Sequence, residues 1–389
     1  MSVYMGVFSV RTTYLKVYRA SRIQTYSSRF RRLHSHTGPD TQRPSFGISF
    51  DIDGVLIRGG KAIGGSPQAL RRLYGDDGTL KIPYIFLTNG GGVPESKRAS
   101  ELSELLGVQI SPLQVVQGHS PFRDLVSRFG NDLIVAVGKG EPAKVMLEYG
   151  FKNVLSIDEY ASFFKGIDPL SRYKNWAFKQ NNEIMKNMNE LDFSYNVNSD
   201  AVKGTFIVSD PVDWGRDIQV LCDILSCGGL PGKEKGHQPA LYFASDDLLY
   251  QAEFPAERLG MGAFRIALEN IFNSVNGIPL QYTSYGKPNP SVFKNAESVL
   301  MQVASTLNGN PDHAGGRTEK ENKFRTIYMI GDNPAVDIKG ATKAGYPWFS
   351  ILIRTGVFKG KDNHPEYPAD MVVENVEEAV EYILKKEAF

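Results

Sequence analysis

After residue 45, the chain alternates between short apolar runs and longer amphipathic stretches. Each apolar run has the length of a buried strand, and the amphipathic stretches are bounded by Pro or Gly, as helices often are. Strand–helix alternation at this spacing predicts a parallel sheet in a doubly wound, Rossmann-like α/β domain. In the first part of the chain we predict strands at 46–52, 82–89 and 131–140, with helices at 66–78, 94–108 and 141–151.

The pattern changes between residues 166 and 200, which are polar and irregular. Two further strands, at 202–210 and 239–247, are each followed by a helix, at 213–229 and 260–277. We interpret residues 166–280 as an inserted α/β domain that divides the main domain into residues 46–165 and 281–389. In the last part we predict a helix at 291–305, a surface loop at 308–325, a strand at 326–333, a helix at 334–347, a strand at 348–356 and a closing helix at 376–387.

The first 45 residues have a composition of their own. They hold eight basic residues against one acid, Asp40, with many Ser and Thr and no long apolar run. This composition is typical of a mitochondrial transit peptide, and we expect cleavage between Arg31 and Phe46. A disordered basic tail without a targeting role is the alternative.

Charge and cysteine content exclude several classes of protein. The chain has 44 Lys and Arg against 43 Asp and Glu, but after residue 45 the counts are 36 and 42, so this part is acidic. An acidic body argues against nucleic-acid binding, and no apolar stretch reaches the ~18 residues of a membrane span. Cys222 and Cys227 fit neither a disulfide framework nor a metal-binding pair, which suits a reducing compartment.

Candidate chemistry lies at the ends of three predicted strands. Asp51 and Asp53 follow the first strand, Thr88 and Asn89 end the second, and Gly331, Asp332 and Asn333 end the strand at 326–333. Ligands bind beyond the carboxyl ends of parallel strands, so we expect these residues to meet in one crevice, together with Lys287 from a loop. Neighbouring carboxylates repel each other, and Mg²⁺ prefers oxygen ligands, so Asp51 and Asp332 are candidates to hold that ion.

The same residues can act on a phosphoryl group. Lys287 and Thr88 can hold it, and Gly54 and Gly90 can let backbone N–H groups approach it. Asp51 is then placed to attack phosphorus, and Asp53 to protonate the leaving oxygen and later to deprotonate water. Asp337 is either a surface acid of a helix or a supporting residue that orients Lys287 or the waters of the metal.

The order of the segments FDIDGV, LTNGGG, YGKPNP and MIGDNPAVD resembles the four motifs of the haloacid dehalogenase (HAD) superfamily. The resemblance covers nearly all of residues 46–389. It implies that Asp51 forms an aspartyl-phosphate, that the backbone carbonyl of Asp53 is a further Mg²⁺ ligand, and that Asp332 completes the metal site. It also implies a supporting role for Asn333 and Asp337, and phosphate binding near Asn89 and Gly90.

The inserted domain resembles the large α/β cap of the class IIA branch, and its sequence is similar to the cat eye syndrome critical region protein 5 family. Such caps cover the phosphate site and read the rest of the substrate, which makes Asp247 and Gly262 our candidate cap residues and Asp210 and Trp214 weaker ones. The resemblance further implies a mitochondrial enzyme with links to glycerophospholipid metabolism, and a homodimer, since capped relatives often dimerise.

We therefore predict a Mg²⁺-dependent phosphatase that acts on a small phosphorylated metabolite, such as a nucleotide, sugar or head-group phosphate. Two other readings use the same residues. A HAD fold without turnover could serve as a binding or scaffold protein in mitochondria. A receiver domain also clusters Asp, Thr and Lys on such a sheet, but the length of this chain and its inserted domain disfavour it.

Overall fold

The first sheet contains six strands, which all run parallel in the order β15-β14-β13-β1-β4-β5. In the computed structural model, residues 45–174, 196, 199–307 and 324–389 are described. The predicted transit peptide therefore lies outside the described residues except for Ser45, as does most of the predicted loop at 308–325. The strands of this sheet are β1 (Phe46–Phe50), β4 (Tyr84–Leu87), β5 (Val115–Val116), β13 (Thr326–Gly331), β14 (Trp348–Ile353) and β15 (Met371–Val373).

Helices cover both faces of this sheet, because its central strands are apolar on both sides. Tyr328 and Ile330 of β13 pack into the cluster of buried side chains that holds α1 (Ser66–Arg71), α2 (Glu95–Leu106) and α11 (Val376–Lys386). Ile327 and Met329 point the other way, toward α9 (Pro290–Thr306) and α10 (Lys339–Ala344). This alternation confirms the predicted doubly wound α/β architecture.

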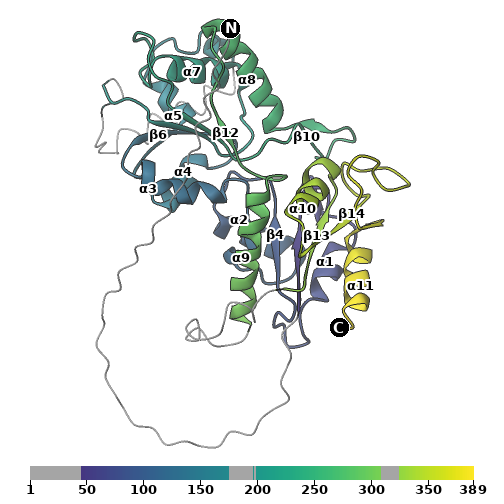
Figure 1. The fold of residues 1–389 in the computed structure, drawn as a ribbon. Coiled ribbons are helices and arrows are strands. Elements are labelled where there is room, and N and C mark those ends of the chain that lie inside the picture. The colour runs from purple at the N-terminus through teal and green to yellow at the C-terminus, as the bar shows by residue number, and fades with distance from the viewer. Residues whose placement is uncertain (1–44, 175–195, 197–198, 308–323) are drawn as a thin grey trace, which may run out of the picture. The chain divides into compact units, whose positions relative to one another are not determined.

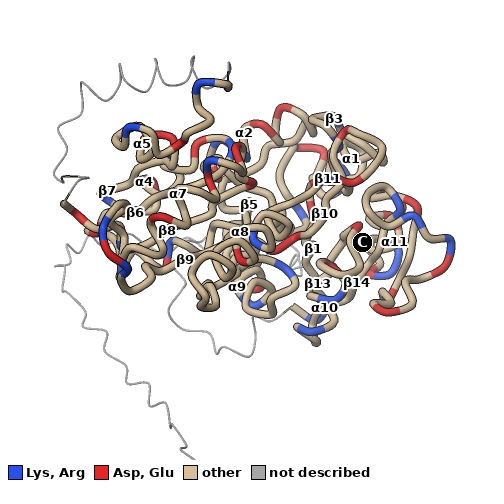
Figure 2. The backbone as a smooth tube through the Cα atoms, turned by 90° about the horizontal axis from the view of Figure 1, so that it is seen from above, with Lys and Arg blue, Asp and Glu red and all other residues tan. Residues whose placement is uncertain are grey.

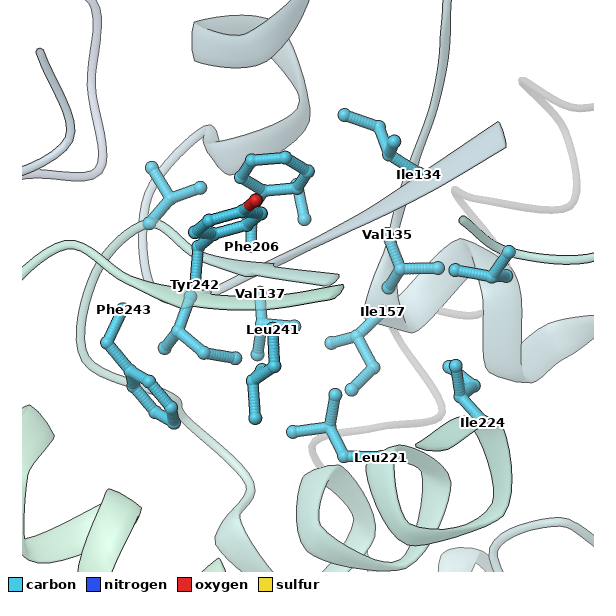
Figure 3. Close-up of a cluster of buried hydrophobic side chains, with 14 of the residues drawn as sticks. Ile134, Val135, Val137, Ile157, Phe206, Leu221, Ile224, Leu241, Tyr242 and Phe243 are labelled. Carbon is cyan, nitrogen blue, oxygen red and sulfur yellow. The ribbon is translucent and has the colours of Figure 1, made fainter. Parts of the chain in front are cut away.

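A second parallel sheet has five strands in the order β12-β9-β8-β6-β7. Figure 1 shows α7 and α8 on one of its faces and α3 and α4 on the other. Its core is a continuous apolar cluster in which the rings of Phe206 and Tyr242 stack at 5.1 Å (Figure 3). The elements are α3 (Val126–Phe129), β6 (Leu133–Val137), α4 (Pro142–Tyr149), β7 (Asn153–Ser156), α5 (Ile157–Ser162), β8 (Gly204–Ile207), α7 (Trp214–Ser226), β9 (Ala240–Phe243), α8 (Met261–Asn276) and β12 (Thr283–Ser284).

The predicted assignment of the strand at 131–140 to the first sheet is wrong. This strand is β6, and it pairs with β7 and β8 in the second sheet. Both sheets are built from short apolar parallel strands that alternate with helices, so the spacing does not reveal where the chain passes from one sheet to the other. We propose that the inserted domain begins after β5, near Gln117, and not at residue 166, and that it ends near Tyr285.

Two short hairpins and several short helices complete the described chain. β2 (Ile57–Arg58) pairs with β3 (Lys61–Ala62), and β10 (Leu249–Tyr250) pairs with β11 (Arg258–Leu259). The 3₁₀ helices are η1 (Pro112–Gln114), η2 (Ser120–Leu125) and η3 (Ser171–Tyr173), and η4 (Pro334–Ile338) is a π-helix. In the described residues, no helix is both long and apolar enough to cross a bilayer. Lys and Arg are interspersed with Asp and Glu along the described chain and do not gather on one side (Figure 2).

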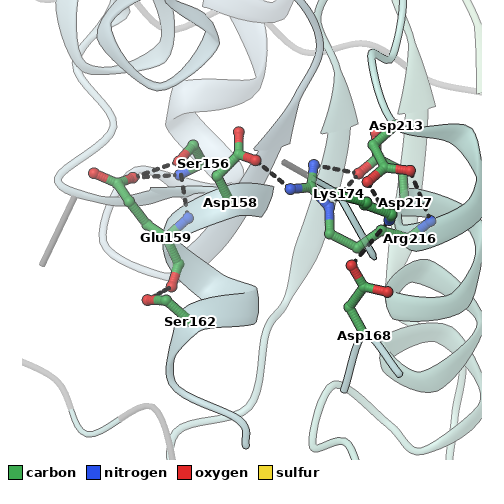
Figure 4. A network of polar contacts seen from close by, with 9 residues as sticks. All are labelled: Ser156, Asp158, Glu159, Ser162, Asp168, Lys174, Asp213, Arg216 and Asp217. Atoms are coloured by element: carbon green, nitrogen blue, oxygen red, sulfur yellow. Dashed lines mark hydrogen bonds and ion pairs between the residues drawn. The ribbon is translucent and has the colours of Figure 1, made fainter. Parts of the chain in front are cut away.

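An ion-pair network fixes the start of α7 (Figure 4). Lys174 donates to Asp168 at 2.9 Å and also to Asp213, whose other oxygen accepts the backbone N–H of Arg216 at 3.3 Å. The Arg216 guanidinium pairs in turn with Asp158 and, at 2.7 Å, with Asp217. These contacts hold the loop between β8 and α7 against the rest of the second sheet.

Replacing Phe293 in α9 tests the packing of the first sheet. Phe293 is fully buried and meets Trp348 edge to face at 4.9 Å, so Phe293→Ala should lower the free energy of unfolding by about 3–5 kcal/mol. Met301 on the same helix is 38% exposed, and Met301→Ala should change the free energy of unfolding by less than about 0.5 kcal/mol. Urea denaturation followed by circular dichroism measures both, and equal losses would contradict the described packing.

Candidate active site

Polar side chains from three neighbouring strands converge at the carboxyl edge of the first sheet. β1 lies between β4 and β13, so the residues that follow these strands meet: Asp51 and Asp53, Thr88 and Asn89, and Asp332 and Asn333. The chain runs from β1 to β4 and β5 on one side and returns to β13 on the other. The site therefore lies where the strand order reverses, which is where open α/β sheets bind ligands.

Lys287 joins this group from the segment that leads out of the second sheet after β12. Its ammonium donates to Oδ1 of Asp51 and to Oδ1 of Asp337, both at 2.7 Å, and its side chain is only 2% exposed. Burial alone would lower the pKa of Lys287, but Asp337 and Asp51 raise it above its usual value. Lys287 is therefore charged and compensates part of the negative charge around it.

Asp51, Asp332 and Asp337 form a cluster with more negative charge than Lys287 offsets. One carboxylate oxygen from each lies within 4.8 Å of the others, and all three residues are buried. Burial raises the pKa of Asp51 well above its usual value, and burial and the charge of Asp337 raise that of Asp332 to about 7. Three buried carboxylates beside one ammonium have the oxygen donors and the net charge that suit a hard divalent cation.

Asp53 faces a different part of the site. A Cβ built on Gly90 would lie 3.2 Å from Oγ1 of Thr88 and 3.3 Å from Oδ2 of Asp53, so these two oxygens face the same point. Thr88 Oγ1 also accepts the backbone N–H of Gly90 at 3.0 Å. Burial raises the pKa of Asp53, whereas Arg98 and Lys139 lower it. Its carboxylate is thus separate from the three-carboxylate cluster.

Gly54 leaves room for Asp332. Its φ is +86°, and a Cβ at this position would lie 2.5 Å from Oδ2 of Asp332. The same oxygen accepts the backbone N–H of Val357 at 2.6 Å, so it is held between the loop after β1 and the loop after β14. Gly54 therefore leaves space for the carboxylate of Asp332, and its predicted role in phosphate approach stays a prediction.

Asn89 ties together the two sheets at the site. Its amide donates to Oδ1 of Asp247 at 2.7 Å and to the carbonyl of Lys287 at 2.9 Å, and its own oxygen accepts the Lys287 N–H at 2.8 Å. Burial raises the pKa of Asp247 to about 7, against the lowering effect of Asn89. Asn89 thus positions Lys287 through its backbone and connects it to a loop of the second sheet.

A cavity of about 100 Å³ opens over these residues. Strand ends of the second sheet form its other wall, because Lys139 follows β6, Asp210 follows β8 and Asp247 follows β9. The cavity is lined by Asp51, Asp53, Thr88, Asn89, Gly90, Lys139, Asp210, Ser245, Asp247, Leu249, Tyr250, Gln251, Gly260, Met261, Lys287, Asp332, Asn333, Val336, Asp337 and Val357. The carboxyl edges of both sheets therefore face one space.

Two predicted cap residues do not line this cavity. Gly262 donates its N–H to the carbonyl of Asp247 at 2.9 Å and supports the loop that carries it. Trp214 donates to the carbonyl of Pro211 at 3.0 Å and packs edge to face on Phe264. Asn333 lines the cavity, and its backbone N–H donates to Oδ2 of Asp337 at 3.1 Å.

Sequence reasoning missed Lys139, Tyr250 and Val357. Lys139 had a signal in the sequence, because it lies between two glycines directly after an apolar run. Asp53 has a similar setting, since it precedes a glycine shortly after the apolar run of β1. Tyr250 and Val357 lie in polar segments, but neither side chain is of a type that indicates phosphoryl or metal chemistry. Their proximity to the site follows from the fold alone.

Comparison with known proteins places the chain in a family. The model "Haloacid dehalogenase-like hydrolase" matches residues 48–152, and a HAD-hydrolase-like model matches residues 284–379. Mitochondrial hydrolase YKR070W of Saccharomyces cerevisiae is 34% identical over 90% of this chain and 98% of its own length.

A second relative is the cardiolipin synthase (CMP-forming)/mitochondrial hydrolase fusion protein of Schizosaccharomyces pombe, which is 34% identical over 92% of this chain. The chain spans only 56% of the length of that fusion protein. A structure described as a possible sugar phosphatase of the HAD superfamily from Cytophaga hutchinsonii is similar in fold, with a TM-score of 0.56 at 15% identity over 86% of this chain and 94% of its own. Together these matches show that the chain belongs to the haloacid dehalogenase superfamily, in its class IIA branch, and is a hydrolase.

Proposed function

We propose that this hydrolase is a Mg²⁺-dependent phosphatase that cleaves a phosphate monoester through an aspartyl-phosphate on Asp51. One observation carries the proposal: Asp51 lies 2.7 Å from the buried ammonium of Lys287 and within reach of a cation shared with Asp332. An acid in that environment has its charge balanced while one oxygen stays available to attack phosphorus.

The donor set fits Mg²⁺, which would be held by Asp51, Asp332 and the backbone carbonyl of Asp53. When bound, this ion would neutralise the charge of the carboxylates and of the phosphoryl oxygens. Asp337 already accepts from Lys287 and from the N–H of Asn333, so it supports the site and leaves metal binding to the other acids.

The residues of the chain divide the chemistry between them. An oxygen of Asp51 forms the new bond to phosphorus while the bond to the leaving oxygen breaks, and Lys287 and Thr88 hold the phosphoryl group. Asp53 donates its proton to the leaving oxygen, which its raised pKa favours. Asp53 then takes a proton from the water that cleaves the aspartyl-phosphate, so the acid is restored.

The enzyme works in mitochondria in our proposal, by way of the presequence predicted in residues 1–45. Relatives over most of the chain carry the words mitochondrial hydrolase in their names, which supports this location. Attachment of the predicted presequence to a fluorescent protein, followed by microscopy, tests it. The predicted homodimer stays a prediction.

Replacing the nucleophile should remove turnover. Asp51→Asn keeps the size of the side chain but lacks the anionic oxygen, so release of phosphate from p-nitrophenyl phosphate should fall by about a thousandfold or more. Full activity of Asp51→Asn would contradict the assigned nucleophile. Silence of the wild-type protein across a broad panel of phosphate esters with Mg²⁺, together with stoichiometric binding of one ligand, would favour the scaffold reading.

Removal of divalent cations should abolish activity and lower stability together. With Mg²⁺ absent, Asp51, Asp332 and Asp337 repel one another, so adding Mg²⁺ should raise the midpoint of thermal unfolding. Scanning fluorimetry and phosphate release after treatment with a chelator, with and without added Mg²⁺, measure both effects. Unchanged activity and unfolding in the presence of excess chelator would exclude a required cation.

Replacing Gly54 should weaken Mg²⁺ binding, beyond the backbone strain that any side chain at positive φ causes. Gly54→Ala and Gly60→Ala both place a side chain at positive φ, at +86° and +77°, which costs about 1 kcal/mol. A Cβ at Gly60 meets nothing within 4 Å, whereas one at Gly54 meets Asp332. Only Gly54→Ala should therefore weaken Mg²⁺ binding by about tenfold or more, as titrated by the rise in unfolding temperature. Equal Mg²⁺ affinity of the two variants would count against Asp332 as a ligand.

A further inference from the structure

Lys139 and Asp210 form an ion pair on the wall of the cavity that the second sheet provides. Nζ of Lys139 donates to Oδ2 of Asp210 at 2.8 Å, and the two side chains are 51% and 30% exposed. The backbone fixes the pair as well, because the N–H of Lys139 donates to the carbonyl of Asp210 at 2.9 Å and Ser209 Oγ donates to the carbonyl of Lys139 at 2.7 Å. The pair is thus held in place without being removed from solvent.

This pair occupies the place in the second sheet that Asp51 and Asp332 occupy in the first. β6 lies between β7 and β8, and the chain passes from β6 to β7 on one side and returns to β8 on the other. Lys139 and Asp210 follow β6 and β8, so they lie at the reversal of strand order in the second sheet, as Asp51 and Asp332 do in the first.

A close backbone contact brings the pair to the first sheet. Gly92, in the loop after β4, has φ +101°, and a Cβ there would lie 2.4 Å from the carbonyl of Lys139 and 2.7 Å from Oγ of Ser209. The carbonyl of Gly92 also accepts the N–H of Glu141 at 2.6 Å. Glycine at position 92 therefore lets the loop that carries Thr88 lie directly against the loop of Lys139.

Asp53, Lys139 and Asp210 line the same cavity. The backbone contact at Gly92 sets the loop of Lys139 against the loop of Thr88, and Thr88 faces the same point as Asp53. In the proposed reaction Asp53 protonates the leaving oxygen, so this pair lines the cavity that receives the leaving group. The ring of Tyr250, with its centroid 5.5 Å from Nζ of Lys139, lines the same part of the cavity.

The charge and size of the cavity restrict the leaving group. The proposed Mg²⁺ and Lys287 compensate Asp51, Asp332 and Asp337, and Asp210 compensates Lys139. The lining therefore leaves no free positive charge to attract a leaving group with a second negative charge. The cavity volume of about 100 Å³ is small beside the roughly 300–1,000 Å³ of common ligand sites. A partly exposed ammonium beside a carboxylate offers a donor and an acceptor side by side, which matches hydroxyl groups.

We propose that Lys139 and Asp210 form the leaving-group subsite, and that the substrate is a phosphate monoester of a small, uncharged, hydroxylated alcohol. This inference rests on the proposed phosphatase function. Asp210 is a specificity-determining residue in it, because it neutralises Lys139 and keeps that ammonium from attracting a second anion.

Two esters of the same size test the subsite. Glycerol 3-phosphate and 3-phosphoglycerate differ by a hydroxymethyl group against a carboxylate. The wild-type enzyme should prefer glycerol 3-phosphate by about tenfold or more in kcat/KM. Asp210→Asn frees Lys139 and should reduce this preference by about tenfold. Lys139→Met should lower kcat/KM for glycerol 3-phosphate and increase the discrimination against the carboxylate.

Asp246→Asn is the matched control. Asp246 lies on the same loop as Asp247 but pairs with Arg265 at 2.6 Å and does not line the cavity, so the ratio of the two kcat/KM values should stay at its wild-type value. Circular dichroism of each variant checks that it is folded.

The outcomes separate this inference from the proposed function. A ratio that neither Asp210→Asn nor Lys139→Met changes, or a wild-type preference for 3-phosphoglycerate, would overturn the subsite and leave the phosphatase intact. Hydrolysis of p-nitrophenyl phosphate without hydrolysis of either ester would overturn the substrate class alone. Failure to hydrolyse any of the three would overturn the proposed function and the subsite with it.

Discussion

The arrangement of Asp51, Lys287 and Asp337 is the contact on which the rest of the site depends. A buried ammonium is costly unless anions surround it, and here two carboxylates accept from it at 2.7 Å each. Lys287 is 236 residues from Asp51 and reaches it only after the chain has completed the second sheet. The site is therefore assembled only when both halves of the first sheet and the exit from the inserted domain are in place.

Both sheets carry their functional polar groups at the same kind of position. In each sheet the strand order reverses between two neighbouring strands, and loops at that point can carry functional side chains without loss of sheet hydrogen bonds. The first sheet places the acids of the proposed reaction there, and the second places Lys139 and Asp210. Because both edges face one cavity, the groups proposed to contact the leaving group lie on a different sheet from the groups proposed to react.

The parts of the site that could be predicted from the sequence are those set by local pattern. Asp51, Thr88 and Asp332 follow apolar runs, and parallel strands bring such ends together, so their meeting was predictable without coordinates. Sequence pattern alone allows Asp337 a surface or a supporting role, and in the structure Asp337 is buried and accepts from Lys287.

Other parts depended on information that local pattern does not contain. The strand at 131–140 was assigned to the wrong sheet because an apolar parallel strand has the same sequence pattern in either sheet. Gly54 looked like a glycine for phosphate approach, and only the fold shows Asp332 within 2.5 Å of its missing side chain. Lys139 has a local signal in its flanking glycines, but its place in the site follows from the sheet that carries it.

Asn89 fixes the distance between the edges of the two sheets that line the cavity. Its one amide group contacts Asp247 of the second sheet and both backbone polar groups of Lys287. Because Asn89 is buried, a change in the distance between the sheets would leave these polar groups unpaired, which is unfavourable away from water. Asn89 positions Lys287 through two of these hydrogen bonds, and through the third it sets how far Asp247 lies from the proposed phosphoryl site. In the proposed reaction, the space for the leaving group and the charge balance of the nucleophile are thus coupled through one side chain.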